Sequence, residues 1–235
     1  MDRLDQAWDR VQPVGEVTLS GTPLLVVLGA ALVVVGVRPL WSVLRLAVTL
    51  VHELGHAGVG VLSGRRFTGF VLRGDMSGHA VTVGPARGFG RVATTWAGYP
   101  APAVVGALLV VLAVAGWGPA VLAVVLLVLV LSLVRARSVL TAAVVLAVGA
   151  ATATLWWSAG DLLQAQVLVG TGLVLLVGAW RHLGAVAGSR DGQSDAAVLA
   201  RLTPLPRTVW LLSFVVVCAG ATWVVAGAVL PALRG

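Results

Sequence analysis

The sequence predicts an all-α polytopic membrane protein of about seven transmembrane helices, with a small membrane-associated β-hairpin between the second and third. Of the 235 residues, 59% are hydrophobic and only 11% are charged, and the mean hydropathy is +1.00. Apolar runs of about 20 residues recur along the chain, each long enough to cross a hydrocarbon core of about 30 Å. The lipid bilayer is therefore the expected surroundings of most of the chain.

Seven apolar runs are candidate membrane spans. Only the second contains charged side chains, and charges within lipid are costly. The fourth run is short, and whether it crosses fully is left open. The runs cover residues 17–37, 39–62, 92–116, 119–134, 139–157, 162–180 and 208–230.

Two segments between the runs are not expected to span. Residues 64–85 alternate apolar and polar side chains around a Gly-Asp-Met-Ser-Gly turn, which predicts a β-hairpin beside the membrane. In the segment 188–207, Ser194 or Asp195 can cap a short helix that Pro204 ends.

The arginines predict the orientation of the chain. The net charge of +7 comes from arginine alone. With seven spans, thirteen of the sixteen arginines fall on the side that holds the amino terminus and the hairpin. The positive-inside rule makes that side cytoplasmic and leaves the carboxyl terminus outside. The first residues lack the features of a signal peptide, so we expect them to be retained. We expect this charge to fix orientation and not to bind nucleic acid.

The second run contains LAVTLVHELGHAGVGVL, residues 46–62, and places three polar side chains in an apolar helix. His52 and His56 are four residues apart, so their Cβ atoms lie about 5–6 Å apart and both imidazoles can bind one metal ion. Glu53 follows His52. In this HExxH pattern the histidines hold zinc, while the glutamate takes a proton from the attacking water and passes it to the leaving amine.

The membrane context strengthens this interpretation of the motif. An ionisable side chain at membrane depth costs at least about 2.5–3.5 kcal/mol on insertion scales and is rarely kept without a use. The alternative is that the three groups only hydrogen-bond to neighbouring helices. The single cysteine, Cys218, excludes a cysteine-based metal site.

The motif and its surroundings resemble the site-2 protease family of intramembrane zinc metallopeptidases, in particular the short bacterial branch without a PDZ domain. The resemblance rests on HELGH, the small residues after it, the hairpin and the segment AGYPAPAVVGALL. It covers about residues 41–108 and 194–206. It implies a Zn²⁺ cofactor held by His52 and His56, Glu53 as general base, and substrates that are transmembrane segments of other proteins.

The third zinc ligand is the least defined part of the site. Better-known branches of the family supply an aspartate followed by glycine, near an asparagine, and this chain has no asparagine. The stretch SDAAVLARLTPLP resembles the corresponding region of the short branch, so Asp195 is the preferred ligand and Asp191 the alternative. Asp195 could instead cap a helix at a solvated surface. It reaches the metal only if its short helix tucks between the sixth and seventh runs.

Other polar residues receive smaller roles. Arg45 and Thr49 share the helix face of the two histidines and could line a cavity toward the metal. For Arg45 we favour snorkelling toward the outer interface. His79 and His182 are weaker candidates for the third ligand and are expected to be interfacial side chains. Small residues after the motif should let a neighbouring helix approach closely: Gly55, Gly58, Gly60 and Gly64.

The expected organisation has four parts. A cytoplasmic amino-terminal segment (1–16) precedes a catalytic membrane core (17–116) that includes the hairpin (64–85). Additional transmembrane helices (117–183) follow, and the last part (184–235) holds the candidate third ligand and the last span. The expected function is an intramembrane zinc endopeptidase of the bacterial cytoplasmic membrane. The alternative is a non-catalytic metal-binding, transporter-like or scaffold protein. The sequence does not indicate an oligomeric state.

Overall fold

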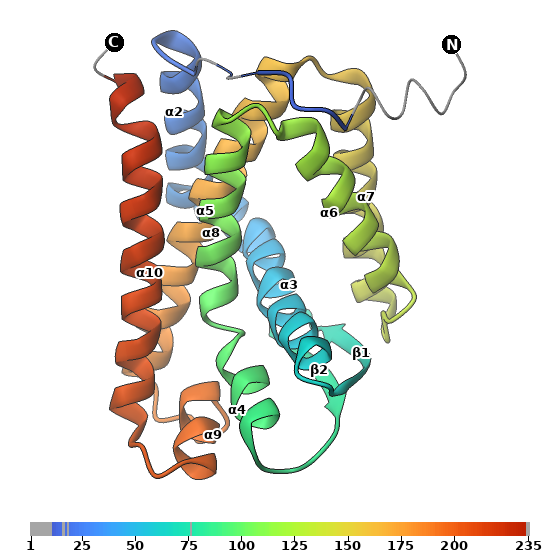
Figure 1. The fold of residues 1–235 in the computed structure, drawn as a ribbon, viewed down its shortest axis with the longest axis vertical. Coiled ribbons are helices and arrows are strands. Elements are labelled where there is room, and N and C mark those ends of the chain that lie inside the picture. Colours follow the sequence, from blue (N-terminus) through green and yellow to red (C-terminus); the bar gives the residue numbers. More distant parts are fainter. Residues whose placement is uncertain (1–10, 16, 18, 76, 234–235) are drawn as a thin grey trace.

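The computed structural model describes residues 11–233, apart from residues 16, 18 and 76. It is mostly helical with one small two-stranded sheet, as the sequence predicts (Figure 1). The hairpin, α4 and α9 lie at one end of the helix bundle, which we call the hairpin end. The elements are α2 (Thr22–Gly36), α3 (Arg38–Leu62), β1 (Arg66–Leu72), β2 (Gly78–Val83), α4 (Phe89–Trp96), α5 (Pro100–Val114), α6 (Gly118–Leu133), α7 (Val139–Ser158), α8 (Asp161–Gly188), α9 (Asp195–Leu202), α10 (Arg207–Val229) and a 3-10 turn, η1 (Pro231–Leu233).

The apolar helices confirm a polytopic membrane protein, whereas the count of seven separate spans is not reproduced. By length and composition, three helices of the described chain can cross a membrane: α7, α8 and α10 with its extension. The number rises to five if two bent pairs, α2 with α3 and α4 with α5, each count as one span. Helix α6 is apolar but shorter than a full span.

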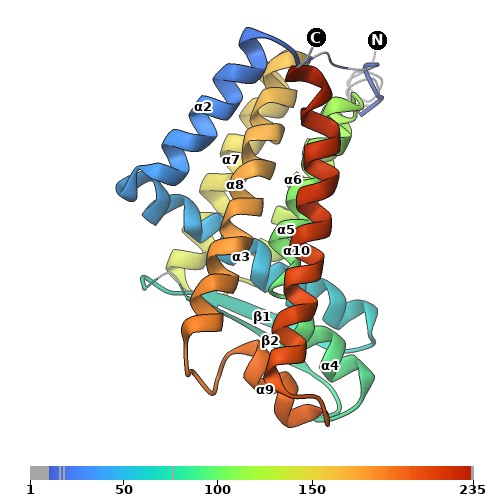
Figure 2. The ribbon, with the colours of Figure 1, turned by 90° about the vertical axis from the view of Figure 1, so that its left-hand side faces the viewer.

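Helices α2 and α3 meet at a sharp elbow. Their axes differ by 97°, and Pro39 in the first turn of α3 cannot donate the backbone hydrogen bond that would continue α2. The two helices therefore progress together from one end of the bundle toward the other (Figure 2). The sequence predicted two independent crossings here.

The elbow changes the expected side of the amino-terminal segment. The amide of Val14 donates to the carbonyl of Gly116 at 3.0 Å, and that of Val17 to Val114 at 3.2 Å. These contacts hold Val14 and Val17 at the link between α5 and α6, at the end of the bundle opposite the hairpin (Figure 1). For the described part of this segment, the expectation that it shares one side with the hairpin is therefore not met. The expected segment boundary at residue 16 lies partly outside the described residues.

Helix α3 lies alongside the hairpin instead of pointing away from it (Figure 2). Arg45 donates to the carbonyl of Asp75 in the hairpin turn at 2.9 Å, so it does not snorkel toward the opposite interface as expected. Fifteen residues farther on, Gly60 packs against Thr82. These two contacts place α3 along the hairpin from its turn to Thr82 on β2.

The hairpin is attached to the bundle on two sides. Strands β1 and β2 pair antiparallel. On the other edge of β1, Phe70 exchanges backbone hydrogen bonds with Arg135 and Arg137 in the link between α6 and α7. Buried side chains of the hairpin, α3, α6 and α7 form a small core: Leu50, Phe70, Leu72, Leu129 and Val145.

The main core forms where α5 and α8 cross. A Cβ on Gly106 of α5 would lie 2.6 Å from the carbonyl oxygen of Gly172 on α8, and a Cβ on Gly172 would lie 2.5 Å from that of Gly106. Glycine at both positions thus lets the two backbones touch, as small residues do between membrane helices. Helix α10 completes this core with Phe214 and Cys218, both buried. The result is an apolar scaffold against which α3 and α9 are positioned.

Candidate metal centre

The break between α4 and α5 faces the histidine helix. The two helices differ in direction by 63°, and Pro100 begins α5 because proline fits the first helical turn and disrupts a helix interior. Gly98, in the break, packs directly against His56, and a Cβ there would lie 2.7 Å from Nε2 of His52. The sequence around the break therefore shapes one wall of the site.

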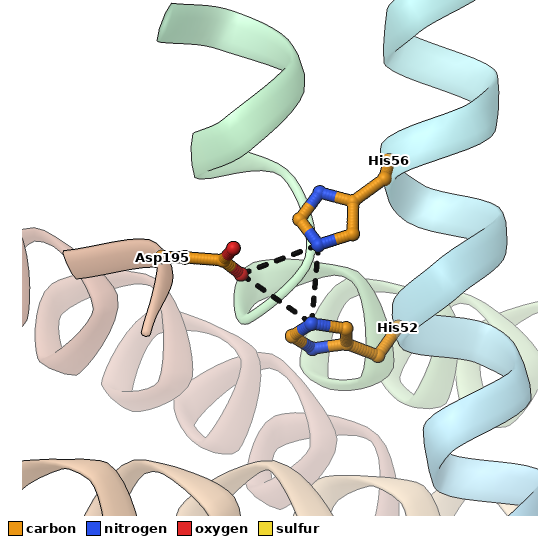
Figure 3. Close-up of side chains that lie close together, drawn as sticks. All are labelled: His52, His56 and Asp195. Carbon is orange, nitrogen blue, oxygen red and sulfur yellow. Dashed lines mark hydrogen bonds and ion pairs between the residues drawn. The ribbon is translucent and has the colours of Figure 1, made fainter. Parts of the chain in front are cut away.

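His52, His56 and Asp195 come together although 139 residues separate the second from the third (Figure 3). The two Nε2 atoms are 3.1 Å apart. Asp195 Oδ2 lies 3.4 Å from Nε2 of His52 and 3.2 Å from Nε2 of His56. The side chains are only 12–19% exposed. Among the described residues, this is the one group of three side chains with metal-binding spacing.

These separations fit the donor set of a tetrahedral zinc ion. Atoms held about 2.0–2.1 Å from such an ion lie about 3.3–3.4 Å from one another. The three observed separations fall close to that value. Three atoms with lone pairs would repel at this distance unless a proton or a cation lay among them. Two imidazoles and a carboxylate are a known donor set for catalytic zinc, which keeps a fourth position open.

The backbone of α4 orients His56. Its Nδ1 lies 2.7 Å from the carbonyl oxygen of Thr94, and only a protonated Nδ1 can donate to a carbonyl. In the neutral ring this leaves Nε2 as the atom with the free lone pair, directed toward Asp195 and His52. Such a hydrogen bond behind a histidine is typical of metal sites.

Helix α9 positions Asp195 at the site. Ser194 is the N-cap residue, Asp195 begins the helix, and Ala196 and Leu199 are buried against the bundle. The short helix forms as expected, but it packs mainly against α10 and α4, whereas the sequence predicted that it would lie between the sixth and seventh runs. Burial by itself would raise the pKa of the Asp195 carboxyl, but the two histidines beside it lower that pKa below its usual range. The carboxyl is therefore held as a carboxylate.

Asp191, the alternative ligand, takes a different position. Its Oδ1 accepts a hydrogen bond from the amide of Gln193 at 2.8 Å within its own exposed turn. It does not join the metal-binding group. The structure therefore favours Asp195 over Asp191 as the carboxylate near the histidines.

Glu53 belongs to α3, and its side chain lies against the start of β2. Its side chain is buried, with 4% of the residue exposed, and a Cβ on Gly78 would lie 2.5 Å from its Oε1. Oε2 is buried without a hydrogen-bond partner among the described residues. The carboxylate is thus held beside His52 with one oxygen not engaged by the protein.

Sequence reasoning missed three contributors to the site: the carbonyl of Thr94, Gly98 and the ring of Tyr99, which lies 5.0 Å from that of His52. The only signal for them was the Gly-Tyr-Pro triplet, which marks a helix break. His182, expected to be interfacial, has its ring 6.5 Å from that of His52.

The expectations for His79 and for the glycines of α3 and the following turn have different outcomes. His79 lies exposed on β2, outside the metal-binding group. Of the four glycines after the motif, Gly55 packs against α5 and Gly60 against the hairpin, as expected, whereas nothing lies within 4 Å of a Cβ on Gly58 or Gly64.

A comparison with protein families agrees with the geometry. The family model described as Peptidase M50B-like matches residues 25–225, which is most of the chain and includes all three side chains of the metal-binding group. Searches of curated proteins and of solved structures find no match. The match confirms the resemblance to site-2 proteases noted in the sequence. The chain therefore belongs to the Peptidase M50B-like family.

Proposed function

We propose that this protein is an intramembrane zinc endopeptidase that cleaves transmembrane segments of other membrane proteins. The family match supports a membrane metallopeptidase. The observation that carries the finer proposal is the meeting of Asp195 with His52 and His56, beside a buried Glu53. Three donors and one adjacent base are the minimum set for hydrolysis at zinc.

Each residue of the site has a distinct role in this proposal. His52, His56 and Asp195 would hold the ion, which supplies a Lewis acid that polarises the scissile carbonyl. Glu53 takes the proton of the attacking water and later delivers it to the leaving nitrogen. The burial of Glu53 and the limited exposure of the other three side chains restrict competing water and strengthen their electrostatic interactions.

The position of the hairpin favours a substrate that binds in an extended conformation. Strand β2 begins at Gly78, beside Glu53, and β1 lies between β2 and the link that holds residues 135–137. The other edge of β2 pairs with no strand in the described part of the chain. An unwound substrate could add to that edge and receive backbone hydrogen bonds close to the base.

The competing proposal is a non-catalytic membrane protein that uses the histidines for metal binding or packing. A metal-binding or packing role alone has no need of a base beside the ligands. The unpartnered buried Oε2 of Glu53 is expensive in an apolar setting unless a reaction uses it. This atom favours the enzyme.

We also propose that the hairpin end faces the cytoplasm of a bacterial cell. With Val14 and Val17 at the opposite end, the hairpin end still holds at least eleven of the sixteen arginines, so the positive-inside rule favours it as the cytoplasmic side. Val14 and Val17, expected on the cytoplasmic side, would then lie toward the outside. Single cysteines at Ser77 and Gly160, in a chain with Cys218 replaced, test this in whole cells. An impermeant thiol reagent should label Gly160→Cys alone, and labelling of Ser77→Cys would reverse the orientation.

The proposed chemistry is tested with Glu53→Gln in the purified full chain loaded with zinc. Cleavage of a single-pass transmembrane peptide should fall by about 10²- to 10⁴-fold, because the amide cannot accept the proton. Bound zinc should stay the same, since Glu53 holds no ligand position. Asp161→Asn, a neutralised carboxylate at the exposed start of α8, is the matched control and should cleave normally.

Two results would contradict the proposal. One is wild-type cleavage by Glu53→Gln, which would remove the base from the mechanism. The other is a wild-type protein that binds zinc and cleaves no transmembrane substrate, which would favour the metal-binding alternative.

A further inference from the structure

Tyr99, the only tyrosine of the chain, stands beside the metal-binding group. It occupies the N-cap position of α5, directly after Gly98. Its ring stacks on Phe214 with centroids 5.1 Å apart and an angle of 19°. It meets the ring of His52 edge to face, at 5.0 Å and 85°. Because Phe214 is fully buried, the tyrosine ring is fixed from two sides.

The hydroxyl of Tyr99 is a donor without an assigned acceptor. It makes no hydrogen bond with the described residues, and its oxygen is not fully buried. Asp195 and Asp191 are near enough to act on it electrostatically. The hydroxyl is therefore accessible, close to the site and available to a substrate.

Other donors around the site are engaged or more distant. The hydroxyl of Thr94 donates to the carbonyl of Gly90 at 2.7 Å, and Arg45 donates to the hairpin turn. His182 lies behind His52 at 6.5 Å between ring centroids. Tyr99 is thus the candidate that combines proximity, a fixed ring and a free donor.

We infer that Tyr99 is a further catalytic residue, whose phenol donates a hydrogen bond to the scissile carbonyl oxygen as that oxygen becomes negative. The inference rests on the proposed peptidase function. A neutral phenol suits this depth, because a second cation near the site would carry a larger desolvation cost.

The role of the phenol follows from the electron and proton balance of the reaction. The water oxygen forms a bond to the carbonyl carbon while its proton passes to Glu53, and the π electrons of the C=O bond move onto the oxygen. When the C–N bond breaks, those electrons return and the proton on Glu53 goes to the nitrogen. Tyr99 keeps its own proton throughout, so removing its hydroxyl removes one hydrogen bond and no proton carrier.

The test uses Tyr99→Phe in the full chain loaded with zinc. The phenylalanine ring keeps the stack on Phe214. We expect kcat to fall by about 10²- to 10³-fold, the usual effect of losing one oxyanion donor, with KM within about twofold and zinc content unchanged. Affinity for a phosphinic peptide, which mimics the tetrahedral oxyanion, should fall by a similar factor. Affinity for the uncleaved peptide on the Glu53→Gln background should not change.

Matched variants separate this role from others. Thr154→Val removes a hydroxyl that bonds only to its own helix, at the carbonyl of Ala150, and should leave every measurement unchanged. A wild-type kcat for Tyr99→Phe would overturn the inference, and so would a kcat loss explained by zinc loss. If His182→Gln lowers kcat and Tyr99→Phe does not, His182 is the donor. If Glu53→Gln cleaves as well as wild type, the proposed function fails first and this inference with it.

Discussion

Helices α3 and α8 were both expected to cross the membrane as single apolar runs, and they differ in what they contact. Helix α8 crosses α5 at Gly172 and buries apolar side chains along its length. Helix α3 turns 97° from α2 and follows the hairpin, and its Arg45 and His56 side chains bond to backbone carbonyls of other segments. Helix α8 is mainly scaffold, whereas α3 holds two members of the metal-binding group.

The difference shows how polar groups are accommodated within a membrane protein. Backbone and side-chain polar groups at membrane depth need partners from the protein itself. On α3 these partners come from segments far along the chain, such as the carbonyls of Asp75 and Thr94 and the carboxylate of Asp195. On α8 the polar contacts lie toward its two ends, such as those of Gln166 with Pro23 and of Trp180 with Thr222, and close packing dominates between them.

The largest expected effect is a loss of zinc affinity caused by a substitution on α9, a helix far from α3 in the sequence. Asp195→Ala removes one of three donors, so zinc affinity should fall by more than about 100-fold, beyond the range for groups that only orient a ligand. Cleavage should be lost with it. Chelator competition and metal analysis measure the change, and Asp191→Ala is the control because that side chain bonds within its own turn.

Equal zinc loss in both aspartate variants would show that α9 as a whole, and not the Asp195 carboxylate, supports the metal. Full zinc retention in Asp195→Ala would exclude it as a ligand.

Much of the scaffold was readable from the sequence because its signals are local. The apolar runs and the alternation around the hairpin turn predicted the helices and the hairpin. The spacing of His52 and His56 predicted their shared face, and the short helix that begins at Asp195 was also expected, although it packs against α10 and α4 instead of lying between the sixth and seventh runs.

What the sequence did not predict depends on angles and distant contacts. Hydrophobic periodicity gives the type of an element and not the angle at which it meets the next, so the elbow before α3 was missed. The position of Val14 and Val17 at the end opposite the hairpin was missed as well. Gly98 and Tyr99 are 42 and 43 residues after His56, and nothing local indicates that their helix break would turn toward it.

Gly98→Ala is expected to have the next largest effect, because its Cβ would enter the space beside both Nε2 atoms. The imidazoles must rotate or the break must shift, so zinc affinity should fall by about 10- to 100-fold. The overall fold should persist. Gly184→Ala on α8, where nothing lies within 4 Å, is the matched control. Unchanged zinc affinity in Gly98→Ala would mean that the break yields easily and does not shape the site.

A smaller effect of a different kind is expected from the scaffold helix. Gly172→Ala places a Cβ against the carbonyl of Gly106, so the free energy of unfolding should fall by about 1–2 kcal/mol. Zinc bound per folded molecule should not change, because the crossing of α5 and α8 is remote from the donors. Thermal unfolding in detergent measures the first and metal analysis the second. Gly149→Ala on α7, an open position, should alter neither.

The smallest expected effect concerns the contact that keeps α3 alongside the hairpin. Arg45→Met keeps the long apolar stem and removes the donor to the carbonyl of Asp75. One exposed hydrogen bond from a charged group contributes about 1 kcal/mol, so amides of the hairpin turn should exchange with solvent up to about fivefold faster. Cleavage should fall by no more than a similar factor, since the catalytic groups stay in place. Hydrogen exchange read by mass spectrometry checks this, with Arg87→Met, an exposed arginine after β2, as the control.

If Arg45→Met leaves the exchange of the turn unchanged, Arg45 does not hold the hairpin, and the snorkelling role expected from the sequence regains support. Faster exchange in Arg45→Met alone would instead show that α3 is held along the hairpin, which is the arrangement that distinguishes it from α8.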